Sequence, residues 1–423
     1  MEMAEFLIRG GKKIKGEIEV RGAKNSALKI LPASILFANP IGITNLPLIE
    51  DVFRMLELLK ALGIRVEKPN GRSLKLGGSE VKIGHLRSDI AERFRASIVL
   101  AGPLLAIGKT VTFPHPGGCV IGKRPIDIFL DGWRSMGAKI RSNKSSYTIE
   151  AKRLVGSQFI FRKVSVTATE TLMLTAVLAH GKTVLKNAAM EPEISSLAKF
   201  LNKNGAKIKG AGTSTVEIIG TGGKLLRGGK TFQVIPDRIE AGDFLILGAA
   251  LKSRLRVIKC NPEHLEAIIT MLRAGGANIK SGHDWVEIRP GRALSGLDVT
   301  TREYPGFVTD LQAPFTVLMT QAMGDSMIFE TVFDGRLNYV EDLVRMGANV
   351  TILDPHRVLV HGPTKLHGRE IESPDLRAGL AFIIAAMVAE GNSVVKNIYQ
   401  IDRGYEKIEE RLQKIGADIR RVG

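Results

Sequence analysis

The sequence predicts a mixed α/β fold built from six copies of one repeat of about 70 residues. Three marks recur along the 423-residue chain at that spacing. The first is a glycine between an amphipathic stretch and an Ile- or Val-containing segment, at Gly63, Gly137, Gly205, Gly276, Gly347 and Gly416. The second is a glycine in a Leu- and Ile-rich setting, at Gly16, Gly84, Gly156, Gly228, Gly296 and Gly368. The third is a polar cluster that opens a stretch of small and apolar residues, near Ala23, Arg95, Ser165, Glu240, Asp310 and Asp375.

Each mark predicts one element of the repeat. The first glycine suits a helix that ends in a left-handed cap and is followed at once by a strand. The second glycine places a further strand. The stretches behind the polar clusters, such as Ala378 to Ala389, are apolar nearly all round. A helix of that kind must be covered on every side, so each repeat is expected to wrap strands around a buried helix and to add an outer amphipathic helix.

Six repeats are too many for one hydrophobic core, which favours two lobes of three repeats each. The chain starts in the middle of a repeat, and a first hairpin within residues 6–20 is expected to pair with the C-terminal lobe. The N-terminal lobe is then residues 22–235, and the C-terminal lobe is residues 1–21 plus 236–423. The crossovers fall near residues 21–23 and 233–238.

Composition favours a soluble cytoplasmic protein that acts on small anions. We find no signal-peptide pattern and no apolar stretch of membrane-spanning length. The net charge is +17 and the pI is near 9.8. No block of five or six consecutive Lys and Arg accompanies that charge, and only 5 Tyr and 2 Trp offer stacking surfaces, so an anion-binding cleft is favoured over nucleic-acid binding. The two cysteines, Cys119 and Cys260, are expected to be reduced thiols.

Cations gather at the predicted starts of buried helices and in the loops that follow strands. Helix N-termini carry partial positive charge and free N–H groups that suit anions, and guanidinium groups bind carboxylate or phosphate in two-point fashion. Taken singly, each of these residues is better explained as a solvated surface charge. Taken together they predict an anion site, with candidates Lys24, Arg95, Arg124, Arg336, Arg377 and Arg403. Spacings of His, Cys and Asp that would bind zinc are absent, so neither a metal nor a cofactor is expected.

The second repeat carries a lengthened, glycine-rich loop between residues 114 and 125. Cys119 lies in it beside Lys123 and Arg124, which favour the thiolate, so a nucleophile or proton donor is as well supported as a small surface residue. Cys260, near a strand end, is expected to be structural. Asp310 is interpreted either as a helix N-cap or as a carboxylate that takes a proton from a substrate hydroxyl. The same two interpretations apply to Glu193, Asp237 and Asp375.

Ten phrases, in order, make the chain resemble the UDP-N-acetylglucosamine 1-carboxyvinyltransferase family over essentially its whole length. They begin at Gly22, Arg95, Pro116, Lys163, Glu191, Pro236, Thr309, Glu330, Asp375 and Ile401. The cysteine loop distinguishes this family from the related enzymes that act on shikimate 3-phosphate. The resemblance implies the enolpyruvyl transferase fold: two inside-out, barrel-like α/β lobes, each with three βαβαββ repeats around buried helices.

The resemblance also implies a substrate site. Lys24, Arg124 and Arg403 would hold phosphoenolpyruvate, with Asn25 beside the sugar. Arg336 and Arg377 join the expected substrate-binding set. Contacts to UDP-N-acetylglucosamine are expected from Arg95, Arg124, Pro125, Ile126, Asp127, Ile128, Lys163, Val164, Ser165, Val166, Asp310 and Val332.

The implied reaction transfers the enolpyruvyl group of phosphoenolpyruvate to the sugar 3-hydroxyl by addition and elimination, releasing phosphate, as the first committed step of peptidoglycan precursor synthesis. Catalysis is expected from Lys24, Cys119, Asp310 and Arg403. Cys119 would donate the proton and could form a covalent phosphoenolpyruvate adduct, and Asp310 would act as base or proton relay. The alternatives are a different acceptor, such as shikimate 3-phosphate, or a nucleic-acid-binding protein. Departures from the family pattern at Thr167, Phe129 and Val99 bear on the nucleotide contacts.

Overall fold

The computed structural model describes residues 4–67, 70–77, 81–115, 121–122, 125–291 and 293–423. The chain divides into two compact units. Unit 1 contains Pro236–Gly423 with the described residues up to Arg21 and residues 121–122, and unit 2 contains the described residues from Gly22 to Ile235 apart from those two. Each unit is described separately below.

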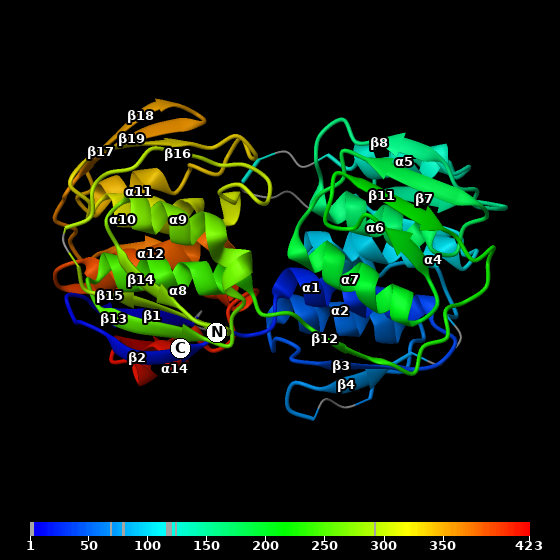
Figure 1. Ribbon diagram of the computed structural model, residues 1–423, viewed down its shortest axis with the longest axis horizontal. Helices are drawn as coiled ribbons and strands as arrows, with labels where there is room; N and C mark the ends of the chain where they lie inside the picture. Colours follow the sequence, from blue (N-terminus) through cyan, green and yellow to red (C-terminus); the bar gives the residue numbers. More distant parts are fainter. Residues whose placement is uncertain (1–3, 68–69, 78–80, 116–120, 123–124, 292) are drawn as a thin grey trace. The chain divides into compact units, whose positions relative to one another are not determined.

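Unit 2 alternates helices and short strands (Figure 1). Its helices are α1 (Lys24–Ala33), the 3-10 helix η1 (Ser34–Leu36), α2 (Glu50–Ala61), α3 (Ser88–Ala91), the 3-10 helix η2 (Arg95–Leu100), α4 (Ala101–Ala106), α5 (Asp127–Ser135), α6 (Val166–Ala176) and α7 (Pro192–Lys203). Its strands are β3 (Ile41–Thr44), β4 (Leu74–Leu76), β5 (Val111–Pro114), β6 (Lys139–Ser142), β7 (Ser146–Glu150), β8 (Gln158–Ile160), β9 (Lys182–Lys186), β10 (Lys207–Lys209), β11 (Thr215–Ile219) and β12 (Thr231–Gln233).

Unit 1 follows the same alternation. Its helices are α8 (Arg238–Ala250), the 3-10 helix η3 (Pro262–Leu265), α9 (Glu266–Ala274), the 3-10 helix η4 (Thr309–Leu311), α10 (Gln312–Met319), α11 (Val340–Arg345), α12 (Leu376–Val388), α13 (Tyr399–Asp402) and α14 (Ile408–Lys414). Its strands are β1 (Glu5–Arg9), β2 (Lys15–Glu19), β13 (Arg254–Ile258), β14 (Asn278–Ser281), β15 (Trp285–Arg289), β16 (Val299–Thr300), β17 (Gly324–Phe329), β18 (Val350–Asp354), β19 (Arg357–Gly362), β20 (Glu370–Glu372), β21 (Asn392–Lys396) and β22 (Asp418–Val422).

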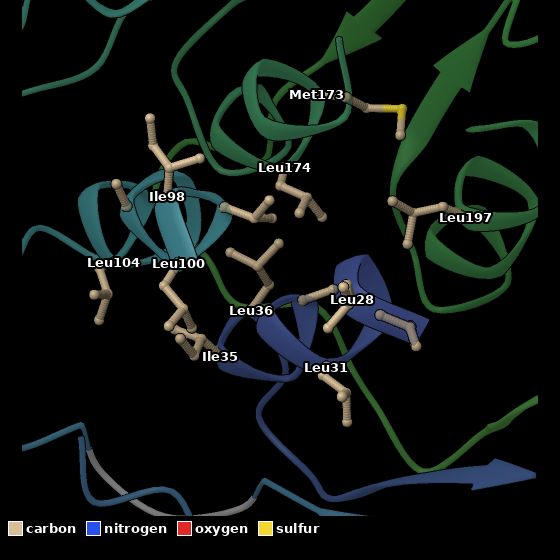
Figure 2. Packing of buried hydrophobic residues seen from close by; sticks show 14 of the residues in the cluster. Leu28, Leu31, Ile35, Leu36, Ile98, Leu100, Leu104, Met173, Leu174 and Leu197 are labelled. Carbon is tan, nitrogen blue, oxygen red and sulfur yellow. The ribbon is translucent and has the colours of Figure 1, made fainter. Parts of the chain in front are cut away.

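The buried helices lie where the sequence predicts them. All of α8 is buried, including its charged first turn, and α12 is buried from Arg377 to Met387. In unit 2, Leu28 and Leu31 of α1 belong to the same buried cluster as Leu100, Leu104 and Leu174 from the neighbouring helical segments (Figure 2). Helices therefore form the interior of each unit and sheets form its outer layer, which confirms the inside-out α/β fold class.

The strands of the described chain form separate sheets that follow one plan, not a closed barrel. In three sheets a strand before a buried helix pairs in parallel with the strand after that helix, and two antiparallel strands complete the sheet, as in β8-β9-β11-β10 and β16-β17-β19-β18. The strands before α1 and α8 are exchanged: β2 pairs in parallel with β13, which follows α8, and β12 pairs in parallel with β3, which follows α1. Strands β1 and β2 enter two different sheets of unit 1, as β20-β21-β1-β22 and β2-β13-β15-β14. The expected hairpin is therefore wrong in one respect, because the two strands do not pair with each other. Strand β1 pairs with β21 and β22, and β2 pairs with β13.

Both sets of repeated glycines have a structural reason. The glycines that follow the outer helices have φ between 92° and 105°, the left-handed cap that the sequence predicts. In the second set, a Cβ on Gly296 would overlap the backbone carbonyl oxygen of Asp325 on the parallel neighbouring strand. Gly84, Gly156, Gly228 and Gly368 approach a neighbouring carbonyl in the same way. In these five repeats the mark therefore records a close approach to the neighbouring strand segment. Gly16 is the exception, because a Cβ there would meet only Ile415 at 3.9 Å, and its φ is 118°.

No helix in the described part of the chain has the length and hydrophobicity needed to traverse a bilayer.

We predict that Gly296→Ala lowers the free energy of unfolding by about 1–3 kcal/mol, because the added methyl group pushes against a backbone oxygen that cannot rotate away. Gly291→Ala is the matched control, since a Cβ there meets its nearest backbone oxygen at 3.6 Å, an ordinary contact. Urea unfolding of both variants measures the difference. Equal midpoints for the two variants would show that the strands separate freely at this point.

Candidate active site

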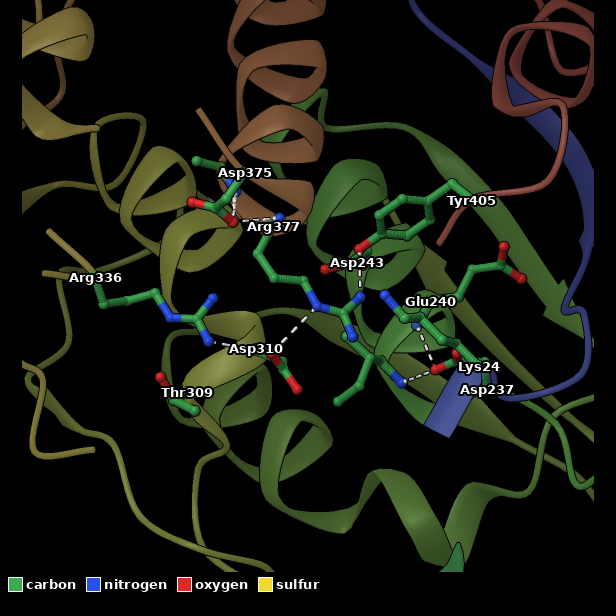
Figure 3. Close-up of polar contacts among 12 residues, drawn as sticks. Lys24, Asp237, Glu240, Asp243, Thr309, Asp310, Arg336, Asp375, Arg377 and Tyr405 are labelled. Atoms are coloured by element: carbon green, nitrogen blue, oxygen red, sulfur yellow. Dashed lines mark hydrogen bonds and ion pairs between the residues drawn. The ribbon is translucent and has the colours of Figure 1, made fainter. Parts of the chain in front are cut away.

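Polar side chains of unit 1 meet where its buried helices begin. Asp310 lies in η4, just before α10, and Arg377 lies in the first turn of α12. Arg377 Nε donates to Asp310 Oδ1 at 3.2 Å, and Arg336 Nη2 donates to the same oxygen at 3.3 Å (Figure 3). The structure thus brings together three residues that the sequence singles out separately.

Asp310 is a carboxylate held between guanidinium groups. Its side chain is 27% exposed, whereas those of Arg377 and Arg336 are 7% and 4% exposed. Burial alone would raise the pKa of Asp310, but Arg377, Arg336 and Arg238 outweigh it and hold the pKa well below its ordinary value. Asp310 is therefore ionised at neutral pH and can accept a hydrogen bond or a proton.

The two interpretations of the acidic residues now separate. Asp375 caps α12 by accepting from the backbone N–H groups of Arg377 and Ala378, and Asp237 caps α8 in the same way. Asp310 makes no capping bond to η4 or α10. The N-cap interpretation is thus correct for Asp375 and Asp237 and wrong for Asp310, whose carboxylate faces side chains instead.

A second carboxylate shapes the segment after β17. Buried Glu330 accepts from the backbone N–H groups of Val332 at 2.8 Å and Phe333 at 3.1 Å. Thr309, which precedes Asp310, donates its hydroxyl hydrogen to the other oxygen of Glu330 at 2.8 Å. Glu330 therefore fixes the Val332 backbone relative to η4, and the guanidinium of Arg336 lies 5.0 Å from the ring centroid of Phe333.

Arg403 follows the short helix α13, also in unit 1. Its Nη1 donates to the Gln400 side chain at 3.0 Å, which orients the guanidinium within its own loop.

In unit 2, the candidate cations begin the buried helices as the sequence predicts. Lys24 is the first residue of α1, and its Nζ pairs with Asp51 Oδ2 of α2 at 2.6 Å. Arg95 begins η2 and donates from Nη2 to the Pro125 carbonyl oxygen at 3.2 Å. Ser165 caps α6 by accepting from the Ala168 N–H. Asn25, Val164 and Val166 lie beside these positions and are half-buried, whereas Lys163 is exposed.

The remaining nucleotide-site candidates lead into α5. Asp127 opens this helix after Pro125, Ile126 precedes it and Ile128 is half-buried. Arg162 donates to Asp127 at 2.8 Å across the repeat boundary. The departures Phe129 and Val99 are both buried in the core, Phe129 beside Trp133 with ring centroids 6.1 Å apart. These two departures are therefore changes of packing, whereas Thr167 is half-buried at the start of α6.

Cys119, Lys123 and Arg124 lie outside the described residues. Of the same loop, residues 121 and 122 belong to unit 1, where the Gly335 N–H donates to the Ile121 carbonyl oxygen at 3.0 Å. Gly335 adjoins Arg336, so this part of the loop is anchored next to a residue that contacts Asp310. Cys260 is buried, and burial raises the pKa of its thiol to about 11, as expected of a structural cysteine.

Within the described ranges, no group of three or more His, Cys, Asp or Glu side chains is arranged to hold a metal ion.

The chain matches the model of EPSP synthase (3-phosphoshikimate 1-carboxyvinyltransferase) over residues 8–412. A UDP-N-acetylglucosamine 1-carboxyvinyltransferase of Koribacter versatilis is 42% identical over 424 residues, covering 100% of this chain and 97% of the relative. One from Campylobacter hominis is 42% identical and covers 99% of both chains. The chain belongs to the UDP-N-acetylglucosamine 1-carboxyvinyltransferase family. The prediction of this family and of a transferase enzyme is confirmed.

Solved structures agree with the fold. The enolpyruvyl transferase NikO from Streptomyces tendae superposes with a TM-score of 0.89 at 24% identity, covering 99% of both chains. EPSP synthase from Acinetobacter baumannii gives a TM-score of 0.75 at 18% identity, covering 99% of this chain and 100% of that one. The predicted enolpyruvyl transferase fold is therefore confirmed in this member of the carboxyvinyltransferase family.

Sequence reasoning missed the partners of the candidate residues. Asp51, which pairs with Lys24, lies in the first turn of α2, where an acidic residue looks like an ordinary helix start. Tyr405 accepts a hydrogen bond from Arg377 and donates one to Asp243. Nothing in the sequence around Tyr405 or Asp243 predicts that either contacts Arg377 or the other. Spacing within one repeat carries no information on contacts between repeats.

A buried ion pair in this carboxyvinyltransferase was also missed. Lys29 Nζ lies 3.0 Å from Glu170 Oε2, and both side chains are almost fully buried between α1 and α6. Burial, reinforced by Glu193 and Glu191 and opposed by Lys29, raises the pKa of Glu170 to about 7. Lys29 is little more than one helical turn from Lys24, so the contact joins α6 to the helix that carries the candidate phosphoenolpyruvate ligand.

We predict that Glu170 makes unfolding pH-dependent. The folded chain keeps this proton up to pH of about 7, whereas the unfolded chain loses it near 4.5, so the free energy of unfolding falls as pH rises between these values. Across that pH range the free energy of unfolding of the wild type should fall by on the order of 1–3 kcal/mol more than that of the double variant Lys29→Met/Glu170→Gln. Urea unfolding at several pH values measures this difference.

The matched control uses the exposed pair of Lys182 and Glu217, whose charged atoms are 3.0 Å apart. Lys182→Met/Glu217→Gln should keep the wild-type pH dependence, because a solvated pair contributes little. If both double variants follow the wild-type curve, Glu170 titrates normally and the assignment is wrong.

Proposed function

We propose that this chain transfers the enolpyruvyl group of phosphoenolpyruvate to the 3-hydroxyl of UDP-N-acetylglucosamine and releases phosphate. The observation that carries the proposal is the ionised Asp310, held by Arg336 and Arg377 at the start of the buried helices. A carboxylate held in one orientation is what removal of a hydroxyl proton requires, and curated relatives named for this reaction match the whole chain.

The cations serve the phosphoenolpyruvate. Lys24, Arg124 and Arg403 are proposed to bind its phosphate and carboxylate, since guanidinium and ammonium groups neutralise charge that grows as phosphate departs. Asn25 lies next to Lys24 on α1 and is proposed to contact the sugar.

Contacts with the nucleotide sugar are proposed for residues on loops and helix starts. Asp310 and Arg377 lie at the starts of buried helical segments, whereas Val332 and Arg336 lie in the segment between β17 and α11. The rest are Arg95, Pro125, Ile126, Asp127, Ile128, Lys163, Val164, Ser165 and Val166. Ser165 caps α6, and the free N–H groups at the start of a helix suit phosphate.

The proposed reaction has two steps. The 3-hydroxyl oxygen adds to C2 of phosphoenolpyruvate while Asp310 accepts its proton, and Cys119 gives a proton to C3, so the double bond becomes a tetrahedral phosphate adduct. The C2–O bond to phosphate then breaks, a proton leaves C3, and the double bond forms again. Cys119 can also add through its sulfur to C2, which gives a covalent adduct. None of these steps requires a cofactor.

The proposed setting is the cytoplasm, where this reaction opens peptidoglycan precursor synthesis. Both proposed substrates are polar, charged small molecules, so neither a membrane nor a nucleic acid is needed. The proposal keeps the assignment of residues 22–235 to one lobe and residues 1–21 plus 236–423 to the other.

We predict phosphate release from phosphoenolpyruvate when UDP-N-acetylglucosamine is the acceptor and none when it is replaced by shikimate 3-phosphate. A colorimetric phosphate assay with the purified chain and each acceptor makes the comparison. Release with shikimate 3-phosphate alone would replace the proposed acceptor. Salt-dependent binding of RNA without any phosphate release would favour the nucleic-acid alternative instead.

We predict that Cys119→Ser lowers kcat at least about a hundredfold, because a hydroxyl group donates its proton far less readily than a thiol. Cys260→Ser is the matched control and should keep turnover, since that thiol is buried beside the Val257 carbonyl oxygen. Cys119→Asp should retain activity, because a carboxylic acid can replace the proton donor. Full activity in Cys119→Ser would remove the thiol from the mechanism.

A further inference from the structure

A buried polar chain continues behind the Asp310 site of unit 1. Arg377 Nη1 donates to the Tyr405 hydroxyl oxygen at 2.8 Å, and the Tyr405 hydroxyl donates to Asp243 Oδ2 at 2.6 Å. Tyr405 and Asp243 are each 1% exposed. Figure 3 shows Arg377 between Asp310 on one side and Tyr405 with Asp243 on the other. The guanidinium is therefore held from both sides.

We propose that Tyr405 and Asp243 are positioning residues for Asp310: they hold Arg377 from behind, so that its Nε faces the carboxylate that receives the acceptor's proton. This inference rests on the proposed function, because it takes Asp310 as the proton acceptor. It concerns Tyr405 and Asp243. Their hydrogen bonds reach the proposed substrate-binding residues through Arg377.

The geometry leaves Arg377 few alternatives. Its Nε and Nη1 lie on different edges of the planar guanidinium, so one bond to Asp310 and one to Tyr405 fix both position and rotation of the plane. The Tyr405 ring also lies beside this group, with its centroid 5.7 Å from the central guanidinium carbon. Without the hydroxyl group, Arg377 can turn toward Asp243 and weaken its bond with Asp310.

The charges favour the same arrangement. Burial raises the pKa of Asp243 well above its ordinary value, against the influence of Arg377 and Tyr405 and with the help of Asp237 and Glu240. A neutral Asp243 still accepts from Tyr405 but does not compete electrostatically for Arg377. The positive charge of Arg377 therefore acts on Asp310, together with Arg336 and Arg238.

Tyr405→Phe tests the inference with little change in volume. We expect kcat for phosphate release to fall about tenfold or more, with the KM for UDP-N-acetylglucosamine nearly unchanged. We also expect Asp310 to be protonated at a higher pH once Arg377 is free to turn, so that kcat of this variant falls at acidic pH values where the wild type keeps its turnover.

Tyr339→Phe is the matched control. Tyr339 is also buried in unit 1, and its hydroxyl oxygen accepts from the Gln312 side chain at 2.9 Å. We expect a comparable loss of stability but an unshifted pH profile. If both tyrosine variants have the same kcat and the same acidic limb, Tyr405 is merely structural and the inference is overturned.

Variants of Asp243 give a second, independent test. Asp243→Asn keeps a neutral acceptor for the Tyr405 hydroxyl and should retain the wild-type pH profile. Asp243→Leu removes the acceptor and should reproduce the profile of Tyr405→Phe. A shifted profile in Asp243→Asn, or a wild-type profile in Asp243→Leu, contradicts the inference.

Wild-type phosphate release with UDP-N-acetylglucosamine is measured first. Its absence overturns the proposed function. Its presence, with identical profiles for Tyr405→Phe and Tyr339→Phe, overturns only the role of Tyr405 and Asp243.

Discussion

Helices that are apolar on nearly every side impose one condition on the whole chain, because each must be covered by protein along its full length. In both units the sheets and outer helices supply that cover, and the strand after a buried helix such as α6, α10 or α12 pairs in parallel with the strand before it. Polar groups are then confined to the ends of these helices. At the N-terminal ends, free N–H groups attract carboxylate caps such as Asp237 and Asp375 and suit anionic ligands.

Crowding at those ends explains the polar cluster of unit 1. Asp243, Asp310 and Arg377 come from three repeats that are far apart in sequence, yet each belongs to the first part of its buried helical segment. Packing the helices against one another brings these residues within hydrogen-bonding distance. Buried charges are tolerated only when they are paired. Arg377 meets that condition for Asp310, while the nearby Asp243 avoids the cost by staying neutral.

The repeated local signals predict the fold. They do not predict which residues of different repeats contact one another. The structure confirms three local signals: capping glycines such as Gly276, the buried stretch that includes Ala378, and glycines of the second repeated set such as Gly296. The partner of Lys24 is Asp51 and that of Lys29 is Glu170, and neither pairing leaves a mark in the sequence. Asp310 resembles an N-cap in the sequence because it opens a buried helical stretch, as Asp375 does in the next repeat, yet only Asp375 caps its helix.

The strength of the hold on Asp310 limits what this carboxylate can do. Guanidinium groups that keep it ionised at neutral pH also make it a weak base, so in the proposed reaction a proton taken from the sugar hydroxyl does not remain on it for long. Orientation must therefore provide much of its effect, since a fixed carboxylate lowers the barrier by aligning the hydroxyl oxygen rather than by strong basicity. An orienting role depends on the geometry of Arg377 more than on the charge of Asp310, and that geometry is set by the buried hydroxyl of Tyr405.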